Sequence, residues 1–230
     1  MPFSSSSRSQ PIALSASTEA QVYLLFALAM GLTVVGAFVG IVYAPLILQN
    51  GLHFFLLFLE LGIILTSGLW SRRAPLNYIL FALFPLSSGI TIAPYLLYVL
   101  AGYANGASIL LNALVSTTFL SLAAAVFART TRINLGAMSQ ALLFGLIGLL
   151  ILGILQLFVP ALRSTQFELI LSGGGVLLFA SFLAFDLQRI QQLGRAGANP
   201  FQLALSLYLD IFNLFLYVVR FMLAISGNRR

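Results

Sequence analysis

Long apolar stretches recur along almost the whole of this chain, each of a length that can cross a lipid bilayer as a helix. One crossing takes about 20 consecutive apolar residues. Residues that end helices, mainly proline, glycine, asparagine and arginine, separate these stretches. The seven stretches lie near residues 21–44, 52–70, 76–99, 107–127, 136–158, 168–188 and 201–225. We therefore predict an all-α polytopic membrane protein with seven transmembrane helices.

The scarcity of charge excludes a soluble fold. Only 7% of the residues are charged and 60% are hydrophobic, whereas an average soluble domain has roughly 25% charged and about 45–50% apolar residues. The net charge of +6 comes from arginines in the links, and no basic stretch is interleaved with aromatic residues. We expect the lipid bilayer as the surroundings of the chain and no nucleic-acid partner.

Missing residue types exclude most classes of enzyme. The chain has no cysteine, which excludes thiol catalysis, disulfides and iron–sulfur clusters. All 11 basic residues are arginine, so neither a Schiff-base lysine nor a P-loop lysine exists. His53 is the sole histidine, and an H-E-x-x-H zinc site cannot be built from it. We expect no enzymatic activity and no cofactor.

The chain divides into a short tail and one membrane domain. Residues 1–20 are rich in serine and have no periodicity, which is typical of a disordered tail. Residues 21–230 form the membrane domain, with no room for a second, soluble domain.

The distribution of arginine predicts the orientation of the bundle, because cytoplasmic links are enriched in arginine and lysine. The odd-numbered links hold only Arg163. The tail and the even-numbered links hold seven arginines: Arg8, Arg72, Arg73, Arg129, Arg132, Arg189 and Arg195. We expect a cytoplasmic N-terminus. A full seventh crossing would carry Arg220, Arg229 and Arg230 outward, and a re-entrant segment would return them to the cytoplasm. We favour a full crossing because nothing inside 201–225 breaks the helix, but the re-entrant alternative remains open.

Three acidic residues lie inside predicted spans. Of the five acids, Glu19 and Glu168 lie at segment edges, where a charge costs little. Glu60, Asp186 and Asp210 lie within spans, where ionisable residues are expensive and most often functional. These three are the first candidates for a functional site.

Asp210 belongs to a polar stripe along the last span. The stripe steps by 4, 4, 3, 4 and 3 residues, which places it on one helical face: Gln202, Ser206, Asp210, Asn213, Tyr217 and Arg220. Such a face must point to the bundle interior or to a water-filled path. Ser206, Asn213 and Tyr217 are therefore candidates for lining an ion path. A buried seam of hydrogen bonds that only joins helices is the alternative, and we favour function because a seam needs no ionisable aspartate.

Asp186 precedes Asp210 by 24 residues, with a short link between the two spans. A short link makes the helices antiparallel neighbours, so the carboxylates can meet near the cytoplasmic side. Two carboxylates in contact titrate as a unit, which would make a proton-responsive switch. The alternative is that Asp186 caps its helix or pairs with Arg189 at the membrane surface.

Glu60, in the second span, either lines the same path or bonds to a hydroxyl group of a neighbouring span. The third span carries a second polar stripe interrupted by Pro85 and Pro94, for which we favour kinked packing. This stripe comprises Ser88, Thr91, Tyr95 and Tyr98. Gly36 and Gly40 form a G-x-x-x-G pattern that indicates closely packed helices.

The C-terminal third of the chain resembles a known family. The run ALSLYLDIFNLFLYVVRF at 204–221 and the element FDLQRI 24 residues before it are similar to the signature of the Bax inhibitor family. SGIT at 88–91, and Glu60 followed by Trp70 and an arginine pair, resemble the bacterial members of this family. The similarity covers nearly the whole chain from about residue 20.

The resemblance implies a fold and an activity. It implies that the last of seven helices lies centrally, with the other six around it. It also implies a pH-sensitive calcium leak in which Asp186 and Asp210 share a proton and gate the path. Glu60 would line the pore. Either Arg72 or Arg73 would hold the closed state, because the spacing matches both.

The leading functional hypothesis is thus a passive, proton-regulated cation path in a bacterial inner membrane, with calcium as the permeant ion. Asp186 and Asp210 would bind calcium only weakly and transiently, because few oxygen ligands are available. The alternative is a non-catalytic regulator that binds a membrane protease or another membrane partner. An intramembrane aspartyl protease is disfavoured because its G-x-G-D element is absent.

Overall fold

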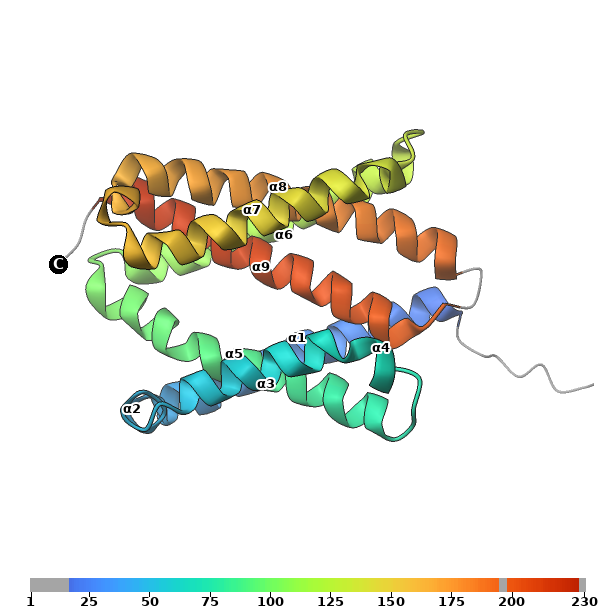
Figure 1. Ribbon diagram of the computed structural model, residues 1–230, viewed down its shortest axis with the longest axis horizontal. Helices are drawn as coiled ribbons and strands as arrows, with labels where there is room; N and C mark the ends of the chain where they lie inside the picture. Colours follow the sequence, from blue (N-terminus) through green and yellow to red (C-terminus); the bar gives the residue numbers. More distant parts are fainter. Residues whose placement is uncertain (1–16, 195–197, 228–230) are drawn as a thin grey trace, which may run out of the picture.

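The computed structural model describes residues 17–194 and 198–227, and this part of the chain is almost entirely helical (Figure 1). Short 3-10 turns at Leu135–Met138 and Pro160–Arg163 flank α7. The α-helices are α1 (Thr18–Val42), α2 (Ala44–Gln49), α3 (Leu52–Leu65), α4 (Ser67–Trp70), α5 (Leu76–Gly102), α6 (Gly106–Thr130), α7 (Ser139–Phe158), α8 (Thr165–Gly194) and α9 (Pro200–Ser226). The predicted all-α membrane fold is confirmed.

Six helices are long and apolar enough to cross a membrane, within the described residues: α1, α5, α6, α7 with the turn before it, α8 and α9. The predicted second span, 52–70, is not one continuous helix. It is split at Thr66 into α3, of 14 residues, and the short α4. The hydroxyl of Thr66 donates to the carbonyl of Gly62 at 2.6 Å, and the indole of Trp70 donates to the carbonyl of Ile63 at 2.9 Å. A helix of 14 residues is about 21 Å long, which is shorter than the roughly 30 Å hydrocarbon core.

The last helix occupies the centre of the bundle. No residue of α9 from position 200 to 224 is exposed, whereas α7 exposes large side chains such as Phe144 and Phe158. α9 packs against α8, α1, α6 and α5, and Figure 1 shows it running between the two layers of helices. A helix whose side chains are apolar or hydrogen-bonded on every face needs a central position, with other helices packed around it.

α9 also runs the full length of the bundle without a break, from Pro200 to Ser226. Its 27 residues correspond to about 40 Å of helix. α1 and α9 begin at the same end of the molecule, and α9 ends at the opposite end (Figure 1). α9 is thus long and apolar enough for a full crossing.

Glycine lets α1 and α5 pack with their backbones in contact. A Cβ atom added at Gly36 would lie 2.1 Å from the carbonyl oxygen of Leu86, and one at Gly89 would lie 2.1 Å from that of Thr33. At Gly40 an added Cβ would lie 2.5 Å from the Cβ of Ala93. The G-x-x-x-G pattern of α1 therefore does mark a close helix contact.

Of the predicted tail 1–20, residues 1–16 lie outside the described residues. α1 begins at Thr18, inside the predicted tail, and Ser17 is its N-cap. The hydroxyl of Ser17 accepts a hydrogen bond from the amide of Ala20 at 3.2 Å. A serine cap of this kind satisfies one of the free amides of the first turn.

Candidate functional site

The two aspartates of α8 and α9 meet inside the bundle. Asp186 is 5% exposed and Asp210 is 6% exposed. Their carboxyl groups lie close enough to interact electrostatically, and Ser206 lies beside Asp186. Within the described residues, Oδ2 of Asp210 has no hydrogen-bond partner. Two buried carboxyl groups in contact favour a shared proton, because both charges together would repel in a medium of low dielectric.

The cation beside this pair is Arg189, which lies one turn after Asp186. Its Nη1 atom is 3.6 Å from Oδ1 of Asp186. Arg72 and Arg73 were expected in this role, but both are exposed in the turn between α4 and α5 and make no ion pair among the described residues. The residue of that turn whose side chain is buried is Ser71. Asn199, the N-cap of α9, donates through Nδ2 to the Ser71 hydroxyl at 3.0 Å.

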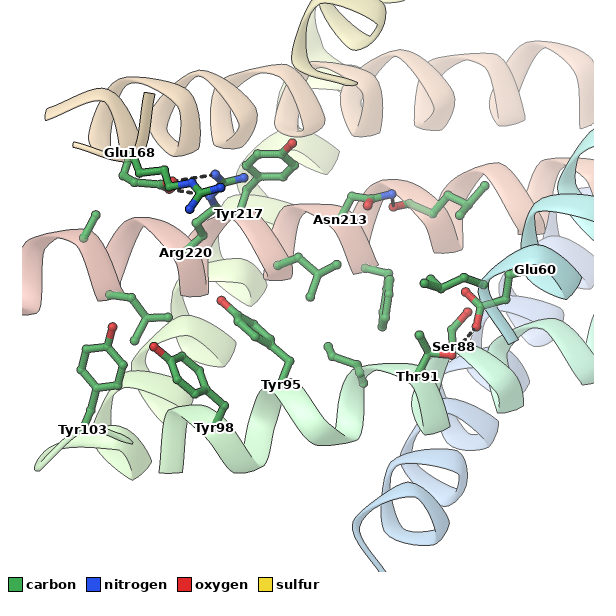
Figure 2. A pocket seen from close by; sticks show the side chains of 18 of the residues that line it. Glu60, Ser88, Thr91, Tyr95, Tyr98, Tyr103, Glu168, Asn213, Tyr217 and Arg220 are labelled. Carbon is green, nitrogen blue, oxygen red and sulfur yellow. Dashed lines mark hydrogen bonds and ion pairs between the residues drawn. The ribbon is translucent and has the colours of Figure 1, made fainter. Parts of the chain in front are cut away.

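A cavity of about 1030 Å³ opens between α3, α5, α8 and α9, and Figure 2 shows its lining. Glu60 of α3 lies at one end, where its Oε1 accepts a hydrogen bond from the hydroxyl of Thr91 at 2.8 Å. Ser88 of α5 lies beside this carboxylate (Figure 2), and the hydroxyl groups of Ser87 and Ser88 donate to the carbonyl of Phe84 at 2.8 and 3.0 Å. The sequence suggested that Glu60 either lines a path or bonds to a hydroxyl group of a neighbouring span. In the structure it bonds to a hydroxyl group of α5 and also lines the cavity.

The polar stripe of the third predicted span lines the same cavity along α5. Ser88, Thr91, Tyr95 and Tyr98 all take part in the lining, although packing was the favoured interpretation of this stripe. In Figure 2 the rings of Tyr95 and Tyr98 rise from α5 toward α9. The two internal prolines leave α5 continuous over its 27 residues.

The polar stripe of α9 is divided between the aspartate pair and the cavity. Asn213 and Tyr217 line the cavity, whereas Ser206 and Asp210 do not. The amide of Asn213 donates to the carbonyl of Leu209 at 2.8 Å. The cavity lining reaches Leu209, the residue directly before Asp210. The predicted residues therefore form two neighbouring groups, with the cavity ending beside the aspartate pair.

An ion-pair cluster at the opposite end of the cavity was missed by the sequence analysis. Arg220 of α9 binds Glu168 of α8 through two contacts, Nε to Oε2 at 2.7 Å and Nη2 to Oε1 at 2.9 Å. Gln156 of α7 accepts from Arg220 and donates to Glu168 at 2.7 Å. Glu168 was set aside as a surface acid, but a polar stripe ending in an arginine was a signal that an acid must lie nearby.

The chemistry that these groups offer is the binding and transfer of protons and cations. Among the described residues, no three His, Cys, Asp or Glu side chains come together as a metal site would need. Calcium prefers six to eight oxygen ligands, and the aspartate pair with Ser206 supplies fewer. The pair fits a brief contact with a passing ion better than a stable calcium site.

Comparison with known proteins matches residues 16–228 to the family described as "Inhibitor of apoptosis-promoting Bax1". An uncharacterized protein of Campylobacter jejuni is 33% identical over 90% of this chain and 88% of its own length. An uncharacterized protein of Rickettsia prowazekii is 31% identical over 91% of this chain and 89% of its own. The mouse protein lifeguard 4 is 30% identical over 73% of this chain and 66% of its own.

Proposed function

We propose, from the premise that this chain belongs to the Bax inhibitor family, that it is a pH-sensitive passive calcium leak gated by Asp186 and Asp210. The observation that carries the proposal is the aspartate pair itself. Both carboxyl groups are buried between two membrane-spanning helices. Burying acids there is expensive, and joining two helices would not require it.

The cavity supplies the wider part of the proposed path. Glu60 and the oxygen atoms of Thr91, Asn213 and the tyrosines can replace part of the hydration shell of a cation. Apolar side chains also line the cavity, among them Phe84, Leu209 and Phe212. In this proposal the structure is the closed state, and these side chains move apart when the leak opens.

Protons would act on the contacts that hold α8 beside α9. An ionised Asp186 attracts Arg189, and a proton shared between Asp186 and Asp210 would join α8 to α9. Full protonation removes the attraction to Arg189, and full ionisation sets the two carboxylates against each other. The first change frees the side chain of Arg189 within α8, and the second pushes α8 and α9 apart, so the calcium flux should depend on pH.

The proposed location is a bacterial inner membrane with the start of α1 in the cytoplasm. The support is the arginine distribution, because one end of the bundle gathers the arginines of the α4–α5 turn, the α6–α7 link and the end of α8. These described residues are Arg72, Arg73, Arg129, Arg132 and Arg189. On this orientation the aspartate pair lies toward the cytoplasm and the cavity toward the outside.

The test is calcium flux into liposomes that hold the purified protein, measured at several pH values. Wild type should conduct above empty liposomes, with a flux that changes with pH. Asp210→Asn should lose that pH dependence, because an amide cannot share or release the proton. Glu60→Gln should instead lower the flux and keep its pH dependence.

Glu19→Gln is the matched control, since Glu19 lies in the first turn of α1 and lines neither the cavity nor the aspartate pair. It should behave as wild type. If wild type conducts no more than empty liposomes at every pH, the leak is excluded, and a non-catalytic regulator that binds a membrane protease becomes the first hypothesis.

A further inference from the structure

Glu60 is a carboxylate that faces the cavity with no counter-charge beside it. The ion pairs of the described residues are Arg189 with Asp186 and Arg220 with Glu168, and neither involves Glu60. Its hydrogen-bond partner is the neutral hydroxyl group of Thr91. Hydrogen bonds stabilise a carboxylate but leave its charge in place, so Glu60 keeps an unmet preference for a cation.

The arginines that line the cavity lie at the end opposite Glu60, and hydrogen bonds hold both of them in place. Arg220 also lines the cavity, but its charge is matched by the carboxylate of Glu168 through two short hydrogen bonds. Arg163 also lines the cavity near Arg220, and it donates to the backbone carbonyls of Gln156 and Leu157. Glu60 supplies the negative charge at the far end. A cation that reaches the far end meets a carboxylate that has no ion-pair partner among the described residues.

The walls of the cavity suit an organic cation rather than a bare ion. Aromatic rings line it on two helices, Phe84, Tyr95 and Tyr98 on α5 and Phe212 on α9. Aromatic faces attract ammonium groups, and they pack against flat or aliphatic groups. The cavity volume of about 1030 Å³ lies near the upper end of the range typical of pockets for drug-sized molecules.

From this arrangement we propose that the cavity is a binding site for a small organic ammonium ion of the arylalkylammonium type. The ammonium group binds the carboxylate of Glu60, and the aromatic body lies against the rings of α5. The inference goes beyond the proposed leak and does not depend on it, because binding needs only the closed structure. If the leak exists, such a ligand occupies its wide part and blocks it.

The test uses fluorine NMR of 2-(4-fluorophenyl)ethylammonium with the protein in nanodiscs of uncharged lipid. Its neutral analogue, 2-(4-fluorophenyl)ethanol, reports partition into the lipid. Wild type should shift and broaden the ammonium signal in a saturable way, beyond empty nanodiscs, and should leave the alcohol signal as the lipid alone leaves it. Glu60→Gln should weaken the affinity about tenfold or more, since a charge-assisted hydrogen bond is lost, and Glu19→Gln should match wild type.

Equal binding to wild type and Glu60→Gln would overturn the proposal, as would equal binding of the ammonium and the alcohol. If Glu60→Gln does not reconstitute as a monodisperse protein, the variant Leu216→Trp tests the proposed site instead. That change adds a ring to the cavity wall and leaves Glu60 intact, and it should reduce binding. Saturable binding without flux would support this site and exclude the leak, whereas flux without binding would exclude this site alone.

Discussion

At the scale of single residues, one glycine of the triplet at 173–175 is required by a contact across two helices. A Cβ atom added at Gly175 would lie 2.1 Å from Cδ1 of Tyr217. The ring of Tyr217 stacks on Phe179, with ring centroids 5.4 Å apart. Gly174, its neighbour, faces outward and has nothing within 4 Å of an added Cβ. The triplet is therefore a packing site in which the three glycines are not equivalent.

We expect Gly175→Ala to destabilise the protein by about 1–3 kcal/mol, because the methyl group overpacks the contact with Tyr217. Gly174→Ala should be neutral or stabilising by up to about 1 kcal/mol, since alanine favours a helix over glycine. Unfolding of both variants in the same detergent measures the difference. Equal stability of the two variants would show that Tyr217 can move away without loss.

At the scale of helices, the cluster of Arg220, Glu168 and Gln156 joins α9, α8 and α7 at one end of the bundle. Arg163, in the turn between α7 and α8, adds hydrogen bonds from Nε to the carbonyl of Gln156 at 2.8 Å and from Nη2 to that of Leu157 at 2.6 Å. α7 exposes most of its surface and packs mainly on α8. The cluster is therefore a main polar link between α7 and the central helix.

We expect Glu168→Gln and Arg220→Gln each to destabilise the protein, because each leaves the opposite charge without its partner. The double variant should be less destabilised than the sum of the two, with a coupling of about 1–3 kcal/mol. Denaturant unfolding of the four proteins in micelles gives this coupling. A coupling near zero would mean that water already screens the pair.

At the scale of the whole molecule, the two ends of the bundle differ in charge. The end that carries Asp186 and the start of α9 has five described arginines, and the other end has Arg163 and the neutralised Arg220. This difference leads to a direct test of orientation, because the chain contains no cysteine. A single introduced cysteine is then the only thiol that a maleimide can label.

Ala161→Cys and Ile133→Cys place that thiol in exposed links at opposite ends, between α7 and α8 and between α6 and α7. For a cytoplasmic N-terminus, a membrane-impermeant maleimide should label Ala161→Cys in spheroplasts without lysis. It should label Ile133→Cys only after permeabilisation. The reverse pattern would invert the proposed orientation and place the cavity on the cytoplasmic side.

Much of the fold followed from the sequence, because apolar length and polar periodicity are local properties. The meeting of Asp186 and Asp210 was also predictable, since a short link forces their helices to be neighbours. The partner of Glu168 could not be predicted, because it depends on which two helices pack together at that end of the bundle. Which residue of the α4–α5 turn points inward, Ser71 or Arg72, could not be predicted either, because it depends on how that turn is folded.

The central position of α9 has a consequence for biogenesis. Synthesis proceeds from the N-terminus, so α1 to α8 leave the ribosome before the helix around which they pack. Until α9 inserts, the polar faces that carry Glu60 and Asp186 lack the helix that fills the space between them. We therefore expect that α1 to α8 complete their packing only when α9 inserts between them.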